Sequence, residues 1–503
     1  MLVKNSEYVA QIDSLGCNGE GICKLEGCAV FVPFALPGET VKVKIVKVKS
    51  NYAFGKLIQI LTPSEKRVES DCPVFFKCGG CSLRHLDYSE QLKWKGEQVK
   101  NCFSSVAGIK IECGEAINVG DNYRYRNKLQ LPVRHTEKGN VIGFFREGSH
   151  DVTEISDCLI QKEWAAKLIS AFKKYLELSG ESCFDEITSR GNVKHLVARS
   201  VSDKLIVTVV ITTEKLKNSE LLTKILSETF DCFSLYVNVN KLNNNVIFGE
   251  KFIHVFGEKR FSCEEDGIKF FMGPESFMQV NDEVRRRIYA DVCGFAKDEN
   301  NSAIIDAYSG AGFLTANLAK YCDKVYGIEI IKEAVDCADE LARMNGLSDK
   351  MTNMCGACEN VLPELVKKID KTRGITVVLD PPRKGVEERV INAVKSVSPS
   401  KIIYVSCNPA TLARDVGLIT GSIVYDGNQL KKAECPEGLY EITHIQAYDM
   451  FPFTKHVETL VVLSHKKPDS HLEVKIDFDN TSLDKMAISE RAEKRKPQEK
   501  TTY

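Results

Sequence analysis

The chain has 503 residues, 43% of them hydrophobic, and a formal net charge of −1. This length can bury more than one hydrophobic core, so several domains are expected, and the balanced charge provides no global basic field that would attract nucleic acid. No apolar signal region opens the sequence and no run of about 18 apolar residues occurs, which favours a cytoplasmic protein without membrane contact, whose 19 cysteines stay mostly reduced.

Residues 1–62 are predicted to form a small, OB-like β-barrel. Glycine turns separate short β-forming runs here at the spacing of an all-β barrel. In "VKVKIVKVK" the alternation slips at Ile45-Val46, which predicts a bulged strand with Lys42 and Lys44 on one outer face. These lysines are either an ordinary solvated strand face or part of a nucleic-acid platform, a common use of small barrels with a lysine stripe.

Residues 63–265 are predicted to form an α+β domain. It begins with "DCPVFFKCGGC", which gathers Cys72, Cys78 and Cys81 and suggests a metal site. Zinc would accept a four-cysteine ligand set, but zinc sites usually pair two short C-x2-C hooks and only one is present. The next segment, "LDYSEQLKWKGEQVKNCF", predicts a helix over residues 88–103, capped at Asp87, that could pack on the following domain.

Residues 266–466 repeat a strand, turn and helix pattern, as in "SAIIDAYSGAGF", "KVYGIEI", "ITVVLDPPRKG" and "KIIYVSCNPATLARDV". This pattern is typical of a Rossmann-like, doubly wound parallel sheet and makes the whole chain a multidomain α/β protein. Residues 467–503 are charged and poor in aromatic side chains, so we expect a mobile tail.

A nucleotide-type cofactor site is predicted where the first of these strands ends. Asp306 leads into a turn with Gly310 and Gly312, and such glycines let a backbone approach a ligand at the carboxyl ends of parallel strands. Glu329 ends the next strand, where a carboxylate can accept hydrogen bonds from the two hydroxyls of a ribose. The third glycine of a dinucleotide fingerprint is missing, which favours S-adenosylmethionine over NAD.

A nucleophile and a base are predicted at the ends of later strands. Cys407 follows a strand and precedes Asn408-Pro409, the N-cap and first residue of a helix whose dipole would lower the pKa of the thiol. Glu458 begins the last strand. A thiolate that adds to carbon 6 of uridine makes carbon 5 nucleophilic, and a base must then remove the proton from carbon 5. The alternatives are a small buried cysteine and an exposed acid.

A third strand end carries Asp380 in "LDPPRKG". On its own this motif is only a rigid turn, because two prolines force an extended loop. Methyltransferases that act on exocyclic amines often have an aromatic residue after D-P-P, whereas here Arg383 follows, which argues against methylation of an amine.

As a set, "GEGI", "CPVFFKCGGC", "YRNKLQ", "FMQVN", "DAYSGAGF", "DPPRKG", "VSCNPATLARD" and "DMFPFTKHVE" resemble motifs of the RNA uridine-5-methyltransferase family. The resemblance covers about residues 8–465 and is to the 23S ribosomal RNA branch, which has a TRAM barrel and an iron–sulfur cluster. It implies S-adenosylmethionine-dependent methylation of carbon 5 of a uridine in 23S ribosomal RNA. It assigns Cys407 as nucleophile, Glu458 as base and Asp380 to the target-base pocket, with Phe277 near the flipped base. The implied cofactor contacts are Gln279, Asp306, Tyr308, Gly310, Gly312, Glu329 and Asp380.

The resemblance also implies a 4Fe–4S cluster. Cys72-x5-Cys78-x2-Cys81 matches the family's cluster motif, and Cys158 in "ISDCLIQ" matches its distant fourth ligand. A fully ligated cluster has no open iron, so we expect a structural or RNA-positioning role. One departure from the family pattern is Ala357, at a position where an acid usually holds the adenine amine.

The target uridine must swing out of its stack, at a cost of a few kcal/mol. Candidate RNA contacts are Lys42, Lys44, Arg124, Arg126 and Lys128, with base stacking by Tyr123 or Tyr125; the alternative is that these are core aromatics and strand-end charges. Transfer RNA is a second possible substrate, although its enzymes usually lack both the barrel and the cluster. A non-catalytic RNA-binding or assembly factor is a third interpretation. No obligate protein partner is implied.

Overall fold

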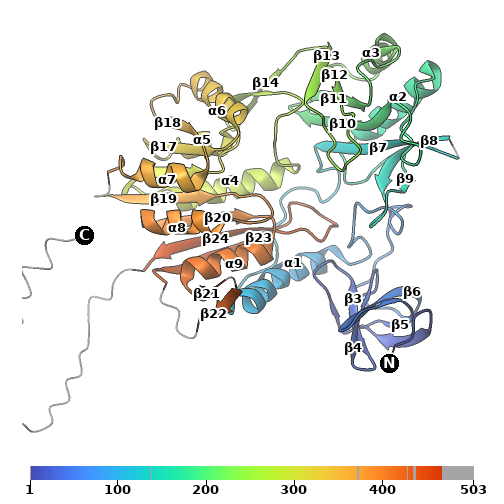
Figure 1. The fold of residues 1–503 in the computed structure, drawn as a ribbon, viewed down its shortest axis with the longest axis horizontal. Helices are drawn as coiled ribbons and strands as arrows, with labels where there is room; N and C mark the ends of the chain where they lie inside the picture. The colour runs from blue at the N-terminus through green and yellow to red at the C-terminus, as the bar shows by residue number, and fades with distance from the viewer. Residues whose placement is uncertain (1, 138, 371–372, 428, 434–437, 467–503) are drawn as a thin grey trace, which may run out of the picture. The chain divides into compact units, whose positions relative to one another are not determined.

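The computed structural model describes residues 2–137, 139–370, 373–427, 429–433 and 438–466 (Figure 1). The described residues up to His465 form one compact unit. Across these ranges, every helix is too short or too polar to cross a bilayer. The predicted mobile tail, residues 467–503, lies outside the described residues.

The N-terminal strands form a six-stranded sheet around a core of its own, in the order β1-β5-β6-β4-β3-β2 (Figure 1). The register of β5 against β6 shifts between Ile45 and Lys47, so the predicted bulge is confirmed. Val43 and Ile45 are buried, whereas Lys42 and Lys44 lie on the outer face. The strands are β1 (Glu7–Gln11), β2 (Ser14–Leu15), β3 (Gly21–Leu25), β4 (Cys28–Val32), β5 (Thr40–Val48) and β6 (Tyr52–Thr62).

The central region is a seven-stranded sheet in the order β13-β12-β11-β10-β7-β8-β9, and α2 (Trp164–Ser179) and α3 (Ser219–Ser227) pack into its core. Its strands are β7 (Lys128–Thr136), β8 (Gly139–Phe145), β9 (Val152–Glu154), β10 (Val193–Val201), β11 (Lys204–Ile211), β12 (Phe233–Val239) and β13 (Lys251–Phe256). A hairpin of β14 (Phe261–Glu265) and β15 (Ile268–Met272) follows. This hairpin spans the expected domain boundary at residues 265 and 266.

The C-terminal sheet has the order β18-β17-β16-β19-β20-β24-β23, in which β18 to β20 are parallel and the last two strands antiparallel. Helices cover both faces, as a doubly wound sheet requires (Figure 1). The chain order reverses between β16 and β19, and ligands bind at such switch points. The strands are β16 (Asn301–Ala307), β17 (Val325–Glu329), β18 (Met351–Cys355), β19 (Gly374–Leu379), β20 (Lys401–Ser406), β23 (Tyr440–Tyr448) and β24 (Glu458–His465).

The helices of this domain divide between the two faces of the sheet. On one face of the sheet, side chains of α4 and α5 pack in a core that includes Ile304 and Val378. On the opposite face, side chains of α7, α8 and α9 form a second core. The helices are α4 (Asp282–Ala296), α5 (Phe313–Leu318), α6 (Lys332–Met344), α7 (Cys358–Val366), α8 (Glu388–Val397) and α9 (Pro409–Thr420). A small hairpin, β21 (Ile423–Asp426) and β22 (Gln429–Lys432), follows α9.

The predicted helix at residues 88–103 is confirmed as α1 (Tyr88–Cys102), which continues into a π-helical turn over Phe103–Ala107. The Asp87 carboxylate accepts a hydrogen bond from the Ser89 backbone N–H, as expected of an N-cap. Val99 and Phe103 are buried in the core of the C-terminal sheet. An N-terminal helix therefore completes one face of the C-terminal domain.

Candidate active site

The carboxyl ends of the parallel strands bring the predicted catalytic residues together. Ser406 of β20 pairs with Thr459 of the antiparallel strand β24. Cys407 and Glu458 lie one residue beyond this pair, toward the same end of the sheet, so they are neighbours. Asp380 directly follows β19, the other neighbour of β20.

The Cys407 thiol is half-buried and is not the low-pKa thiol that the sequence predicted. Burial raises its pKa, the charges of Glu458 and Asp380 raise it further, and the Arg383 guanidinium lowers it. The N-cap itself is confirmed, because the Asn408 side chain accepts hydrogen bonds from the first turn of α9. The helix end therefore does not outweigh burial beside a carboxyl group.

The two carboxyl groups are buried as well. Glu458 is 2% exposed, and burial together with the charge of Asp380 raises its pKa well above the usual range, while Arg383 opposes this shift. Burial raises the pKa of Asp380 to about 7. These shifts are the consequence of placing acids in a poorly solvated site beside one another.

Arg383 and His456 are the site residues that the sequence analysis missed as such. Arg383 lowers the pKa of both Cys407 and Glu458, and it lines a cavity together with His456. Burial lowers the pKa of His456 to about 4, and Arg383 adds to this, so the imidazole is neutral at pH 7. The available signal was the cation three residues after Asp380 at a strand end.

The glycine turn after β16 is held by Glu329. Its carboxylate accepts hydrogen bonds from the backbone N–H groups of Gly310, at 3.0 Å, and of Ile331, at 2.9 Å. Gly310 and Gly312 have φ angles of +54° and +81°, and a Cβ atom on Gly312 would lie 2.7 Å from the Ala338 side chain. Both glycines are therefore required by backbone geometry.

Asp306 links the strand before the glycine turn to α5, the helix after it. Its carboxylate accepts a hydrogen bond of 2.6 Å from the Thr315 hydroxyl, and its other oxygen is buried without a partner among the described residues. Burial raises its pKa to about 7. Tyr308 lies between Asp306 and the glycines with a φ angle of +70°, an uncommon conformation for a tyrosine.

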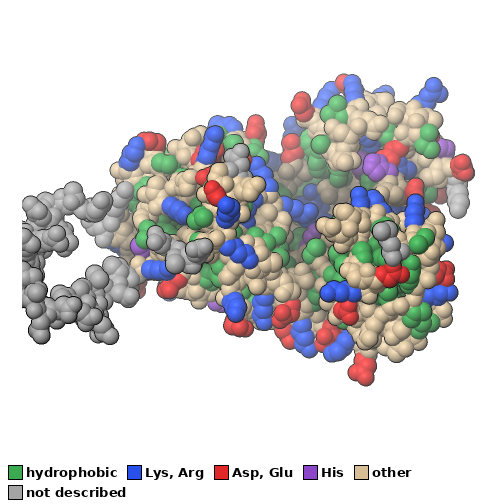
Figure 2. Space-filling model, turned by 60° about the horizontal axis from the view of Figure 1, so that its bottom comes forward, with side chains coloured by type: hydrophobic (Ala, Val, Ile, Leu, Met, Phe, Trp, Pro, Cys, Tyr) green, Lys and Arg blue, Asp and Glu red, His purple; other side chains and the backbone are tan. Residues whose placement is uncertain are grey.

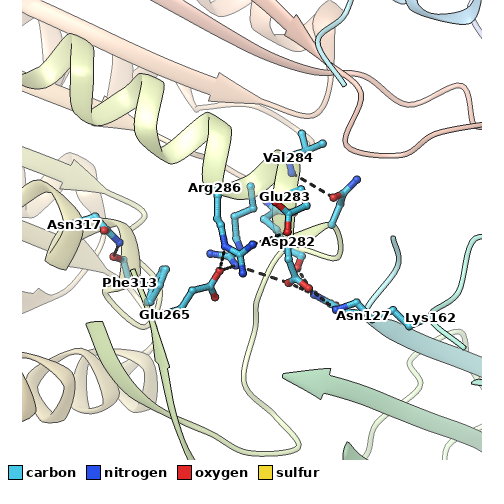
Figure 3. A network of polar contacts seen from close by, with 12 residues as sticks. Asn127, Lys162, Glu265, Asp282, Glu283, Val284, Arg286, Phe313 and Asn317 are labelled. Atoms are coloured by element: carbon cyan, nitrogen blue, oxygen red, sulfur yellow. Dashed lines mark hydrogen bonds and ion pairs between the residues drawn. The ribbon is translucent and has the colours of Figure 1, made fainter. Parts of the chain in front are cut away.

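The segment around Gln279 bridges the central region and α4. The Asn127 amide donates a hydrogen bond of 3.1 Å to the Gln279 carbonyl. It also donates one of 2.7 Å to Asp282 (Figure 3). Lys162 binds the same carboxylate at 2.7 Å. Phe277, two residues before Gln279, is 76% exposed, so its ring is accessible to solvent.

The four predicted cluster ligands line one cavity of about 340 Å³, which Arg383 and His456 also line. They are Cys72, Cys78, Cys81 and Cys158, and each is a free thiol. Burial raises the pKa of Cys78 to about 11 and of Cys81 to about 12. Within the described ranges, no group of three or more His, Cys, Asp or Glu side chains is arranged to hold a metal ion.

The side chains predicted to contact RNA differ in their exposure and in the partners that they have within the fold. Lys42 forms an exposed ion pair with Glu7, and Arg126 lines the cavity of the four cysteines. Burial lowers the pKa of Lys128 to about 8, and the charges of two neighbouring arginines add to this. Figure 2 shows basic side chains interspersed with acidic ones across one face, so any RNA contact there is local.

Two of these predictions need correction. Arg124 makes a bidentate ion pair with Asp157, at 2.8 and 2.7 Å, and donates to the Cys158 carbonyl, so it supports the cysteine loop instead of standing free for RNA. Tyr125 is 7% exposed and packs in a core with Phe453, which excludes base stacking. The polar ends of both side chains find partners inside the fold.

Comparisons with known proteins agree with this geometry. The model of the tRNA (uracil-5-)-methyltransferase family matches residues 87–466, and that of the TRAM domain matches residues 3–58. Relatives from Clostridium tetani and Bacillus cereus, both named uncharacterized RNA methyltransferases, are 37% and 35% identical to this chain and cover 92% of it and 97% of their own lengths. The solved Pyrococcus abyssi tRNA (uracil-54, C5)-methyltransferase in complex with S-adenosyl-L-homocysteine is 26% identical with a TM-score of 0.71, over 90% of this chain and 99% of that one.

Fold and site together define an RNA methyltransferase, as the sequence predicted. The chain belongs to the tRNA (uracil-5-)-methyltransferase family and carries an N-terminal TRAM domain.

The buried carboxyl of Asp306 predicts a pH-dependent stability. Its pKa of about 7 in the folded state exceeds the ordinary value of 3.8, so the fold binds this proton more tightly and loses stability as pH rises from about 4 to about 7. Asp306→Asn should raise the melting temperature of the ligand-free protein at pH 8 by about 2–4 °C, with a smaller gain at pH 5. Exposed Asp349→Asn is the control, and an equal gain at both pH values would contradict the prediction.

The electrostatics of Cys407 predict how its alkylation depends on pH. Because Arg383 lowers the thiol pKa and Glu458 raises it, Arg383→Met should move the midpoint of iodoacetamide labelling to higher pH and Glu458→Gln should move it to lower pH. Mass spectrometry of the Cys407 peptide measures the labelling, and exposed Cys355 in the same samples serves as the internal control. Unchanged midpoints in both variants would show that the two charges do not act on the thiol.

Proposed function

We propose that the protein uses S-adenosylmethionine to methylate carbon 5 of a uridine in 23S ribosomal RNA, with Cys407 as nucleophile and Glu458 as base. The observation that carries the proposal is the pairing of Ser406 with Thr459, because it makes Cys407 and Glu458 neighbours. Membership of a uracil-5-methyltransferase family supports the reaction type.

In the proposed reaction Cys407 is first the nucleophile and later the leaving group, and Glu458 is the base. The Cys407 thiolate forms a bond to carbon 6, and the displaced electron pair makes carbon 5 nucleophilic. Carbon 5 then takes the methyl group from the sulfonium, whose methyl–sulfur bond breaks to leave a neutral thioether. The Glu458 carboxylate removes the proton from carbon 5, the released electron pair reforms the carbon 5–carbon 6 double bond, and the carbon 6–sulfur bond breaks to restore the thiolate. Arg383 stabilises both anionic groups, as its effect on their pKa values indicates.

S-adenosylmethionine supplies an electrophilic methyl group when bound. The glycine turn fits such a ligand, because Glu329 is oriented by two backbone N–H groups and has further lone pairs for ribose hydroxyls. Ile330 and Ile331 beside it are 68% and 56% exposed and could pack against the adenine. Ala357, the N-cap of α7, offers no acid to the adenine amine.

A 4Fe–4S cluster is the metal centre that we propose for the four cysteines. Their thiols line a single cavity, and four thiolates are the usual ligands of such a cluster. A four-iron cluster is larger than one ion, so its ligands stand further apart than the ligands of zinc do. Because no group of three or more His, Cys, Asp or Glu side chains is arranged to hold a metal ion among the described residues, this proposal rests on the motif resemblance and on the shared cavity.

Transfer RNA is the second candidate substrate, and one comparison favours it. The archaeal tRNA enzyme aligns with 90% of this chain, an alignment that must include part of residues 1–62. The barrel alone therefore does not separate the two kinds of RNA. The motif resemblance to the ribosomal branch, with its four cysteines, supports 23S ribosomal RNA.

The function is tested with radiolabelled S-adenosylmethionine and either unmodified 23S ribosomal RNA or transfer RNA. We expect 5-methyluridine in 23S ribosomal RNA only, and Cys407→Ala should reduce its formation by at least about 10⁴-fold because no other thiolate can replace the nucleophile. Label in transfer RNA alone would favour the second candidate. Label in neither RNA, from folded protein that retains its metal, would contradict the proposal.

Glu458→Gln separates the base from the nucleophile. This variant can still add Cys407 and transfer the methyl group, but it cannot remove the proton from carbon 5. We therefore expect a covalent RNA–protein adduct that survives denaturing electrophoresis and carries the methyl label. Free methylated RNA from this variant at the wild-type rate would exclude Glu458 as the base.

The cluster is tested by metal content. Protein purified without oxygen should contain about four irons per chain and absorb visible light, and Cys81→Ser or Cys158→Ser should lose both signals because each removes one thiolate ligand. Cys355→Ser is the matched control, since Cys355 is exposed and lies outside the cavity. One equivalent of zinc and no iron would contradict the cluster.

A further inference from the structure

The connection between β23 and β24, residues 449–457, ends directly before the proposed base. At its start, the Asp449 carboxylate forms an ion pair of 2.5 Å with Lys95 of α1, and both side chains are fully buried. The Tyr88 hydroxyl, also from α1, donates a hydrogen bond of 2.7 Å to the other carboxylate oxygen. One N-terminal helix therefore binds both oxygens of the residue that opens the connection.

The same N-terminal segment holds the middle of the connection. Lys95 also donates to the Phe451 carbonyl at 3.1 Å, and the backbone N–H groups of Ser82 and Leu83 both donate to the Phe453 carbonyl at 3.0 Å. Phe453 has a φ angle of +65°, which is uncommon for an aromatic residue. Such a conformation persists only where surrounding contacts impose it, and such residues cluster at functional sites.

A buried ion pair is a poor way to gain stability alone. The loss of hydration of two charges offsets much of their attraction, and apolar side chains of similar size often serve as well. What the pair supplies is orientation, because Lys95 and Tyr88 each bind a different oxygen of the Asp449 carboxylate. This arrangement fixes where the connection leaves β23 and where Glu458 enters the site.

We propose that Lys95 is a positioning residue, which acts through Asp449 to hold the connection and thereby aligns Glu458 with the proton on carbon 5 of the target. The inference rests on the proposed function of Glu458. The Lys95 side chain is fully buried, so it acts through its neighbours in the fold, and its effect falls on the step after methyl transfer.

Lys95→Met keeps the length of the side chain and removes its charge. We expect release of methylated RNA to slow by about 100-fold, the loss that a misplacement of about 1 Å can cause. The covalent RNA–protein adduct should accumulate, whereas binding of S-adenosylhomocysteine should stay within about twofold of wild type. A purely structural role would lower adduct formation and methylation together, so the adduct is the decisive readout.

Two further variants complete the test. Lys93→Met removes an exposed charge from the same helix, paired only at the surface with Glu90, and should behave as wild type. Tyr88→Phe removes one hydroxyl from Asp449 and keeps the ring, so it should fold even if Lys95→Met does not. It should accumulate adduct to a smaller extent. The proposal is overturned if folded Lys95→Met forms no adduct or, where Lys95→Met does not fold, if Tyr88→Phe forms none.

Glu458→Gln in the same assay separates this proposal from the proposed function. If Glu458→Gln forms no adduct, the assignment of the base fails, and the inference on Lys95 fails with it. Suppose instead that Glu458→Gln accumulates adduct, whereas folded Lys95→Met loses methylation and forms no adduct. Then only the positioning role of Lys95 is overturned.

Discussion

β20 and β24 run antiparallel, and the hydrogen-bonded register between them decides what meets at the end of the sheet. Because Ser406 lies opposite Thr459, the residue after β20 adjoins the first residue of β24. A shift of one residue would turn the Glu458 side chain to the other face, away from Cys407. The buried apolar residues of β24 alternate between the two cores of the sheet, with Leu460 and Val462 in one and Val461 and Leu463 in the other.

The resulting site contains more acidic than basic side chains. Glu458, Asp380 and Asp306 are buried near one another, and each has a raised pKa. Arg383 lowers the pKa of Glu458 and Cys407, so it tempers the repulsion where the proposed chemistry takes place. A positively charged sulfonium ligand would be attracted to such a site, which agrees with the proposed methyl donor.

The N-terminal half of the chain is part of the active site's support. Helix α1 contributes to the core of the C-terminal sheet, and Ser82 and Leu83, directly after the cysteine segment, hydrogen-bond to the connection before β24. The four cysteines share a cavity with Arg383 and His456. A metal centre at these thiols would therefore adjoin Arg383 and His456. Its loss would disturb the connection between β23 and β24.

Local patterns in the sequence determined much of the fold. The bulge near Val46, the cap at Asp87, the glycine turn after Asp306 and the N-cap at Asn408 depend on a few neighbouring residues, and the structure confirms them. Motifs also identified Cys407, Asp380 and Glu458 as candidates. Tertiary structure decided what local pattern cannot contain: the raised pKa of Cys407, which comes from burial and from a carboxyl group far along the chain, and the pairing of Arg124 with Asp157. It also decided that Lys95 reaches Asp449, because residues more than 350 positions apart meet only when the whole core is packed.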